Sequence, residues 1–159
     1  MKPTYILSTT LCLVVILASC TKKQEDDKTN NTTSSAKQQL LEAGKWQLSA
    51  KTATINYMGK DTTADLYPDV DNCEKDDFVE FFSNKTVIRN ENIIKCNGNP
   101  QSSTFTWQLL DNESKIAIYD SNPDTLNLEV SQTQLKLSQT KPNSSGIPVT
   151  FKETYKNIK

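Results

Sequence analysis

The sequence predicts an all-β domain, an up-and-down antiparallel meander that closes into a barrel of about eight strands, with a short helix before the first strand. From Trp46 to Tyr155, hydrophobic residues alternate with polar ones in short runs, which is typical of strands with one buried face. Sequences that favour turns separate these runs. A meander of this length tends to close, because closure removes exposed strand edges. A sandwich of two sheets is the alternative architecture.

Residues 1–19 have the features of a cleavable secretory signal peptide. A basic start at Lys2 is followed by a mostly apolar run over residues 6–17 and then by the small residues Ala18 and Ser19. The run is too short to span the hydrocarbon core of a bilayer, which needs roughly 20 apolar residues. We therefore expect the mature chain to begin at Cys20.

The end of this signal resembles the bacterial lipobox, because residues 17–20 read Leu-Ala-Ser-Cys. The resemblance implies lipidation of Cys20, and several acyl chains give lasting membrane attachment since each buried CH₂ contributes about 0.8 kcal/mol. Thr21, where an aspartate would imply retention in the inner membrane, implies an outer-membrane location. Residues 22–28 are similar to the charged export tag of Bacteroidota surface lipoproteins, which implies exposure at the cell surface.

Between the signal and the barrel, the sequence predicts a tether and a helix. Residues 20–35 contain no large apolar side chain after Cys20, so they cannot bury enough surface to offset the entropy of ordering, and we expect a flexible lipidated tether. Residues 36–159 are expected to form the barrel domain. At its start, Leu40 and Leu41 lie among strong helix formers, which predicts one or two helical turns that end at Gly44.

The alternating runs predict the strands in chain order. Hydrophobic side chains at every second position share one face, and the polar side chains between them share the other. The runs are Trp46 and Leu48; residues 78–82; residues 86–89; Phe105, Trp107 and Leu109; Ile116 and Ile118; Leu126, Leu128 and Val130; Leu135 and Leu137; and Val149, Phe151 and Tyr155. Turns are expected at 111–114, 121–124, 131–132 and 141–146. The polar segment 57–77 predicts a long loop, or a loop plus an irregular edge, at one end of the barrel.

The cysteine count predicts one disulfide. Cys12 lies in the signal peptide and Cys20 is expected to carry lipid, which leaves Cys73 and Cys96 as an even pair in an oxidising compartment. The alternative is a metal site with two cysteine ligands. That alternative has no imidazole ligands to complete it, because the chain contains no histidine.

The composition excludes several classes of function. A net charge of -1 and a single arginine, Arg89, present no basic face for nucleic acid. The absence of histidine removes the usual general base near neutral pH. With four glycines, the chain has no glycine-rich phosphate loop. We therefore expect a non-enzymatic protein with no catalytic residue, no cofactor and no bound metal.

Carboxylates are concentrated in segment 65–77, and they support two minor hypotheses. Ca²⁺ prefers several carboxylate and carbonyl oxygens, but no glycine forms the sharp turn and no spaced glutamate closes the site, so a solvated acidic loop is the favoured interpretation. Asp77 and Glu80 could serve glycoside hydrolysis only if one carboxyl were buried with a raised pKa. The sequence carries no sign of such burial, and Asp76 is expected to cap a turn or to pair with a lysine.

Several short motifs together resemble the lipocalins. Residues 44–46 (Gly-Lys-Trp) after a short helix resemble the Gly-x-Trp start of that family, and residues 72–81 with Cys96 resemble the lipocalin-like outer-membrane lipoproteins of the Bacteroidota. The resemblance covers roughly residues 40–155 and implies a lipocalin-like barrel. One departure is the last strand, which carries Lys152 and Lys156 where lipocalins place an arginine over the first-strand tryptophan.

Aromatic residues suggest where a ligand would bind. Trp46, Phe81, Phe105 and Trp107 could line an apolar pocket, or they could fill the core of a small barrel. The leading hypothesis is an outer-membrane-anchored protein that binds a small apolar or amphipathic ligand at the open end of the barrel. The alternative is an accessory subunit with a solid core that binds a cell-surface protein partner through its loops.

Overall fold

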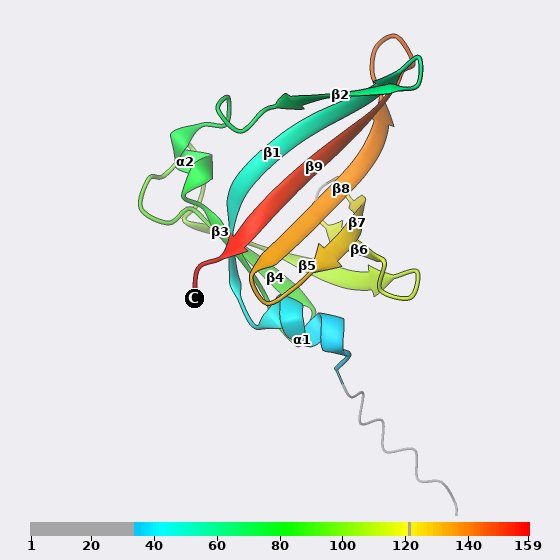
Figure 1. Cartoon of the computed structure of the whole chain (residues 1–159). Coiled ribbons are helices and arrows are strands. Elements are labelled where there is room, and N and C mark those ends of the chain that lie inside the picture. Colours follow the sequence, from blue (N-terminus) through cyan, green and yellow to red (C-terminus); the bar gives the residue numbers. More distant parts are fainter. Residues whose placement is uncertain (1–33, 121) are drawn as a thin grey trace, which may run out of the picture. The chain divides into compact units, whose positions relative to one another are not determined.

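The computed structural model describes residues 34–120 and 122–159 (Figure 1). The predicted signal peptide, the lipidated Cys20 and nearly all of the tether lie outside the described residues, and they stay predictions. The helices and strands of the described residues, in chain order, are α1 (Ala36–Glu42), β1 (Lys45–Tyr57), β2 (Lys60–Asp65), α2 (Asn72–Lys75), β3 (Phe78–Phe81), β4 (Thr86–Asn90), β5 (Ser102–Leu110), β6 (Lys115–Tyr119), β7 (Asp124–Val130), β8 (Gln134–Pro142) and β9 (Pro148–Asn157). Within this part of the chain, no helix has the length and apolarity needed to cross a membrane.

Eight of the strands form a closed antiparallel barrel, which confirms the predicted fold class. Strands β3 to β9 pair in sequence order, and β1 joins the two ends of this series by pairing with both β3 and β9. Every pairing is antiparallel, as expected when short turns connect neighbouring strands. Closure satisfies the backbone donors and acceptors that an open meander would expose along its two edges.

Strand β1 changes its partner along one edge. Residues 45–47 pair with β3, whereas residues 52–57 pair with β2, and β9 runs along the opposite edge through both regions. As a result, β2, β1, β9 and β8 continue as an extended sheet past the closed part of the barrel (Figure 1). The segment 57–77, expected as a long loop or a loop plus an irregular edge, therefore contains a regular edge strand and the short helix α2.

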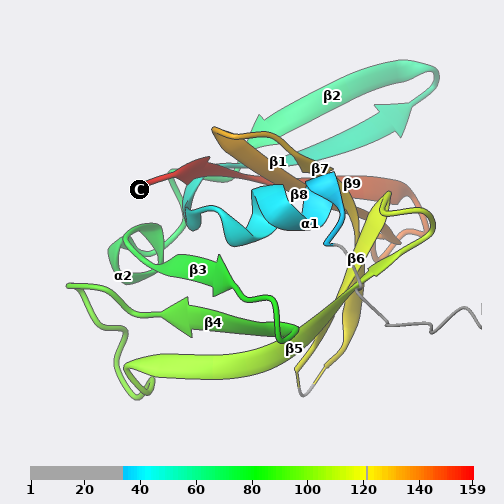
Figure 2. The ribbon, with the colours of Figure 1, turned by 90° about the horizontal axis from the view of Figure 1, so that it is seen from below.

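Helix α1 covers one end of the barrel (Figure 2). The Ser35 side chain accepts a hydrogen bond from the backbone N–H of Gln38, which caps the start of the helix. Leu41 is fully buried, and its carbonyl oxygen accepts a 2.9 Å hydrogen bond from the indole N–H of Trp46. At Gly44, a Cβ atom would come within 2.5 Å of the Asn157 side chain, so a larger residue where the chain passes from α1 into β1 would require that side chain to move.

The buried core lies at this covered end. Its side chains come from α1 and from seven of the strands, and they follow the alternation that the sequence predicts. Phe81 and Trp107 meet edge to face, with their ring centroids 5.4 Å apart. The core residues are Leu41, Trp46, Phe81, Val87, Trp107, Ile116, Leu128, Leu135 and Leu137.

Candidate ligand-binding site

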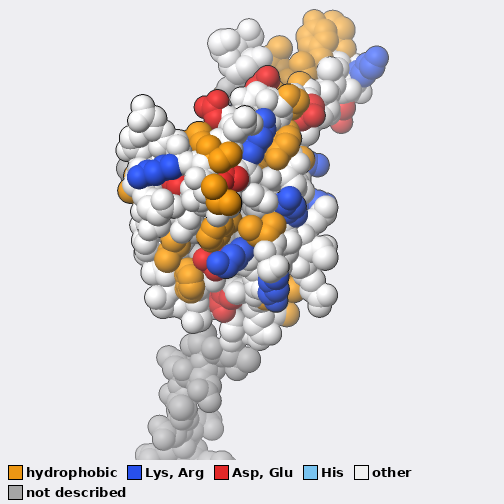
Figure 3. All heavy atoms as spheres, turned by 90° about the vertical axis from the view of Figure 1, so that its left-hand side faces the viewer, with side chains coloured by type: hydrophobic (Ala, Val, Ile, Leu, Met, Phe, Trp, Pro, Cys, Tyr) orange, Lys and Arg blue, Asp and Glu red, His pale blue; other side chains and the backbone are white. Residues whose placement is uncertain are grey.

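A cavity of about 280 Å³ lies where β1 leaves β3 and turns toward β2. Apolar side chains from β1 and β3 line it together with charged side chains from β1, α2, β4 and β9 and from Asp77, which directly precedes β3. The lining residues are Trp46, Leu48, Lys51, Glu74, Asp77, Phe78, Val79, Arg89, Glu153 and Tyr155. Hydrophobic, acidic and basic side chains are likewise interspersed on the face of the molecule that carries α2 (Figure 3). The cavity can therefore contact both a polar and an apolar part of one small molecule.

A bulge in β1 brings Lys51 into this cavity. The pairing of β1 with β9 shifts register between Leu48 and Ala50, so that Leu48 lies opposite Tyr155 whereas Lys51 lies opposite Glu153. One extra residue in a strand moves the side chains that follow it to the opposite face of the sheet. Without the bulge, the alternation that starts at Trp46 would place Ala50 on the inner face and Lys51 on the outer one.

Lys51, Glu153 and Tyr155 form one wall of the cavity. The Lys51 Nζ atom lies 3.0 Å from Glu153 Oε1, and the Tyr155 hydroxyl donates a 2.7 Å hydrogen bond to Glu153 Oε2. Burial raises the pKa of the Tyr155 phenol well above its ordinary value, and the nearby Glu153 carboxylate raises it further. The phenol is therefore a stable hydrogen-bond donor at neutral pH, and both carboxylate oxygens of Glu153 have a partner.

Asp77 and Arg89 form another part of the cavity wall. Arg89 donates from Nε and from one terminal nitrogen, at 3.1 and 3.0 Å, and both bonds go to Asp77 Oδ2. Asp77 is only 7% exposed, and its other oxygen, Oδ1, has no hydrogen-bond partner in the described residues. Burial raises the pKa of the Asp77 carboxyl, the Arg89 hydrogen bond opposes this change, and the Glu91 carboxylate adds to it.

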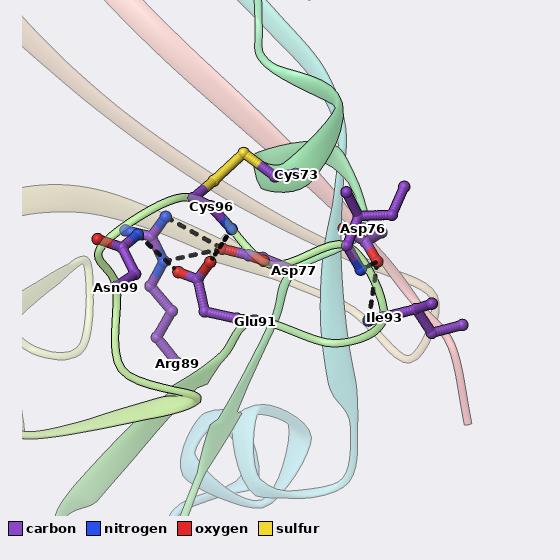
Figure 4. Close-up of a disulfide and its surroundings, with 9 residues drawn as sticks. Cys73, Asp76, Asp77, Arg89, Glu91, Ile93, Cys96 and Asn99 are labelled. Atoms are coloured by element: carbon purple, nitrogen blue, oxygen red, sulfur yellow. Dashed lines mark hydrogen bonds and ion pairs between the residues drawn. A yellow bond between two sulfur atoms is a disulfide. The ribbon is translucent and has the colours of Figure 1, made fainter.

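The loop after β4 is held beside Asp77 by a second carboxylate and by the disulfide (Figure 4). Glu91 accepts hydrogen bonds from the backbone N–H of Cys96 and from the Asn99 side chain, both at 2.9 Å. The Cys96 bond lowers the pKa of Glu91 more than burial raises it. Cys96 is bonded to Cys73 of α2, as predicted, with a Cα–Cα distance of 5.2 Å. The bridge thus joins the loop to the helix that presents Glu74.

Asp76 caps the same loop. Its Oδ2 atom accepts hydrogen bonds from the backbone N–H groups of Ile93 and Ile94, at 3.0 and 2.9 Å. This agrees with the prediction that Asp76 caps a turn. The two isoleucine side chains point away from the core and are 88% and 51% exposed.

A family model described as a lipocalin-like domain matches residues 43–141, which is more than half of the chain. The chain belongs to the lipocalin-like domain family. Members of this family are generally binding proteins rather than catalysts. The match covers the lipocalin-like barrel from the start of β1 to the end region of β8 and leaves β9 outside it. A search among curated proteins finds no match.

The aromatic residues singled out in the sequence occupy different places in the lipocalin-like barrel. Trp46 is fully buried and forms part of the cavity wall. Phe81 and Trp107 lie in the packed core, Phe105 is partly buried against it, and none of the three is among the residues that line the cavity. The structure thus brings Trp46 to the cavity and places the other three in or against the core, which corresponds to the filled-core interpretation of these side chains.

Several polar residues of the cavity were not recognised as site residues from the sequence. Lys51 was missed because the bulge in β1 has no clear signal in the hydrophobic pattern. Glu153 lies between Phe151 and Tyr155 on the predicted inward face of the last strand. Arg89 carried one signal, since it is the only arginine of the chain and occupies an inward position two residues after Val87. A charged residue at an inward position of a predicted barrel strand is the pattern that could have revealed this site.

The two hypotheses on the acidic segment receive no support from the structure. In the described residues, no three histidine, cysteine, aspartate or glutamate side chains come together as a metal site. Asp77 and Glu80 lie on opposite faces of the chain at β3, and Glu80 pairs with Lys45 at 3.5 Å. The lipocalin-like barrel therefore does not present these two carboxylates to one glycosidic bond.

Proposed function

We propose that this lipocalin-like protein is a non-enzymatic binding protein that holds a small amphipathic molecule in the cavity beside Asp77 and Arg89. The supporting observation is the juxtaposition of apolar wall residues with the carboxylate of Asp77, one oxygen of which has no hydrogen-bond partner among the described residues. Ligand sites in proteins commonly combine mostly apolar walls with a few polar groups, in volumes of about 300–1,000 Å³. A cavity of about 280 Å³ favours a compact ligand over a long acyl chain.

Native mass spectrometry of the protein purified gently from its own cells tests this function. We expect a co-purified small molecule that is lost when Leu48→Phe fills the cavity from β1. The matched control is Leu110→Phe, the same substitution at a partly buried position of β5 that does not line the cavity. A wild-type protein that carries no ligand and binds none from a cell extract would contradict the proposal.

The proposal includes a location at the outer membrane through lipid on Cys20. It is supported by the lipobox-like residues 17–20 and by Thr21, which follows the cysteine. Metabolic labelling with an alkyne fatty acid should label the wild-type protein and leave Cys20→Ala unlabelled. Surface exposure predicts that a protease added to intact cells degrades the domain, and protection of the domain would contradict surface exposure without contradicting the anchor.

A protein partner is the second candidate function, and the loop after β4 favours it. Ile93 and Ile94 are exposed on a loop whose backbone is fixed by Asp76 and by the disulfide. A rigid loop that presents apolar side chains loses little entropy when it binds. A photo-reactive residue at position 93 should form one discrete cross-link in intact cells, and a smear or no product would argue against a specific partner.

A further inference from the structure

The charges of the cavity are not balanced. Three carboxylates line it, and two cations face them. Lys51 pairs with Glu153, and Arg89 pairs with Asp77. The third carboxylate, Glu74, is exposed on α2 and makes no ion pair with any described residue. When all five groups are ionised, the cavity therefore carries one unpaired negative charge at its rim.

The paired carboxylate Asp77 also lacks one donor. Arg89 uses two nitrogens on the single oxygen Oδ2, and this arrangement leaves Oδ1 of a side chain that is 7% exposed without a hydrogen bond in the described residues. An ionised carboxylate accepts several hydrogen bonds. A ligand ammonium close to this carboxylate would stabilise its negative charge, whereas a ligand carboxylate would add repulsion beside it.

Other carboxylates near Asp77 favour a cation over an anion. The negative charges of Glu91 and Asp76 both raise the pKa of the Asp77 carboxyl, in addition to the effect of burial. Arg89, the cation that could attract an anionic ligand, is already engaged with Asp77. More negative than positive groups therefore lie near the Asp77 carboxylate.

The remaining walls suit the body of an organic cation. Phe78 and Tyr155 line the same cavity, together with Leu48 and Val79. Aromatic faces attract ammonium groups, and the attraction is larger where water is excluded. A bare metal ion would leave these apolar surfaces unused, and in the described residues no cluster of metal-ligating side chains forms.

We propose that the cavity selects a small protonated organic amine, with its ammonium group between Asp77 and Glu74 and its compact apolar body against Phe78 and Leu48. This inference rests on the proposed function, because it names the chemical class of ligand for that same cavity. It excludes anionic amphiphiles such as fatty acids as the preferred ligand.

Isothermal titration calorimetry with three probes of similar shape tests the inference. The probes are 2-phenylethylamine, 2-phenylethanol and 3-phenylpropionate, which carry a positive, a neutral and a negative polar end. We expect the amine to bind at least roughly tenfold more tightly than the alcohol, and the carboxylate to bind most weakly. Higher salt concentration should weaken binding of the amine and leave binding of the alcohol nearly unchanged.

Substitutions connect this selectivity to the two carboxylates. Glu74→Gln removes the exposed carboxylate of the rim and should reduce amine affinity without changing alcohol affinity. Asp77→Asn should reduce the amine preference further. Glu129→Gln is the control, since it removes the same charge from an exposed residue that does not line the cavity. If Asp77→Asn fails to fold, Glu74→Gln still decides the test because its side chain is exposed.

Each outcome separates the inference from the proposed function. If all three probes bind equally and Leu48→Phe abolishes their binding, the cavity is a ligand site but the amine preference is wrong. Tighter binding of 3-phenylpropionate than of the amine would also overturn the inference and leave the binding function in place. If the amine does not bind at all, the inference fails, and the native mass spectrometry described above then decides on the function by itself.

Discussion

Removal of the disulfide should lower the free energy of unfolding by a predictable amount. The bridge closes a loop between Cys73 and Cys96, which are 23 positions apart. In the chain-entropy model, a cross-link over a loop of this length stabilises the folded state by about 3.4 kcal/mol near room temperature, because it restricts the unfolded chain. We therefore expect Cys73→Ser/Cys96→Ser to lose roughly this amount.

The structure explains why the loss should not be much larger. The loop after β4 keeps other attachments when the bridge is absent, since Glu91 binds the backbone of Cys96 and Asp76 binds the backbone of Ile93 and Ile94. The folded state of the double variant should therefore retain the barrel and the position of the loop. Removal of the bridge then acts mainly by increasing the conformational entropy of the unfolded chain.

Equilibrium unfolding in urea, followed by tryptophan fluorescence, measures this change. Both tryptophans lie in the core, so their emission reports the loss of the barrel. Chemical reduction of the wild-type protein should reproduce the loss, and the same reductant should not affect the double variant. A double variant within about 1 kcal/mol of the wild type would refute the chain-entropy argument for this bridge.

Three further substitutions probe individual contacts. Trp46→Phe should cost about 1–3 kcal/mol in urea unfolding, because the carbonyl of the buried Leu41 loses the indole N–H as its donor. An unchanged midpoint would contradict the role of this bond. Above about pH 10, the phenol of Tyr155 ionises in the unfolded chain but not in the folded one, so it lowers the free energy of unfolding by about 1.4 kcal/mol per pH unit in the wild type. Tyr155→Phe should remove this contribution and make the loss of stability with pH less steep. Equal slopes in both proteins would show that this phenol is not the cause. Arg89→Leu should destabilise the protein near neutral pH, because a charged Asp77 then lacks its partner. The loss of stability relative to the wild type should become smaller as the pH falls, because the Asp77 carboxyl, whose pKa is raised by burial, takes up a proton. A loss of stability that is independent of pH would contradict this pairing.

The closed barrel could be predicted because its signal is repeated in every strand. Trp107 and Leu128, for example, each belong to a run in which buried and exposed positions alternate, and each is buried where the pattern places it. The disulfide could be predicted by counting cysteines. Gly44 predicted the end of the helix, and α1 indeed ends at Glu42, two residues before it.

Two features could not be predicted, because their cause lies in pairing rather than in burial. Strand β2 exposes all six of its side chains, so it has no hydrophobic pattern and is defined only by its hydrogen bonds to β1. The bulge after Leu48 likewise depends on how β1 aligns with β9. The place of Lys51 in the cavity follows from that bulge, so the sequence predicted the barrel but not this cavity residue.

Closure of the barrel depends on β9, the last of its strands to be synthesised. This strand forms hydrogen bonds with β8 and with β1, and its partner for Trp46 is Asn157, more than one hundred positions later in the chain. Until that segment is available, two strand edges stay open and the tryptophan lacks its neighbour. Folding must therefore wait until nearly the whole domain has been synthesised, and a chain truncated before β9 would be readily degraded by proteases and would tend to aggregate.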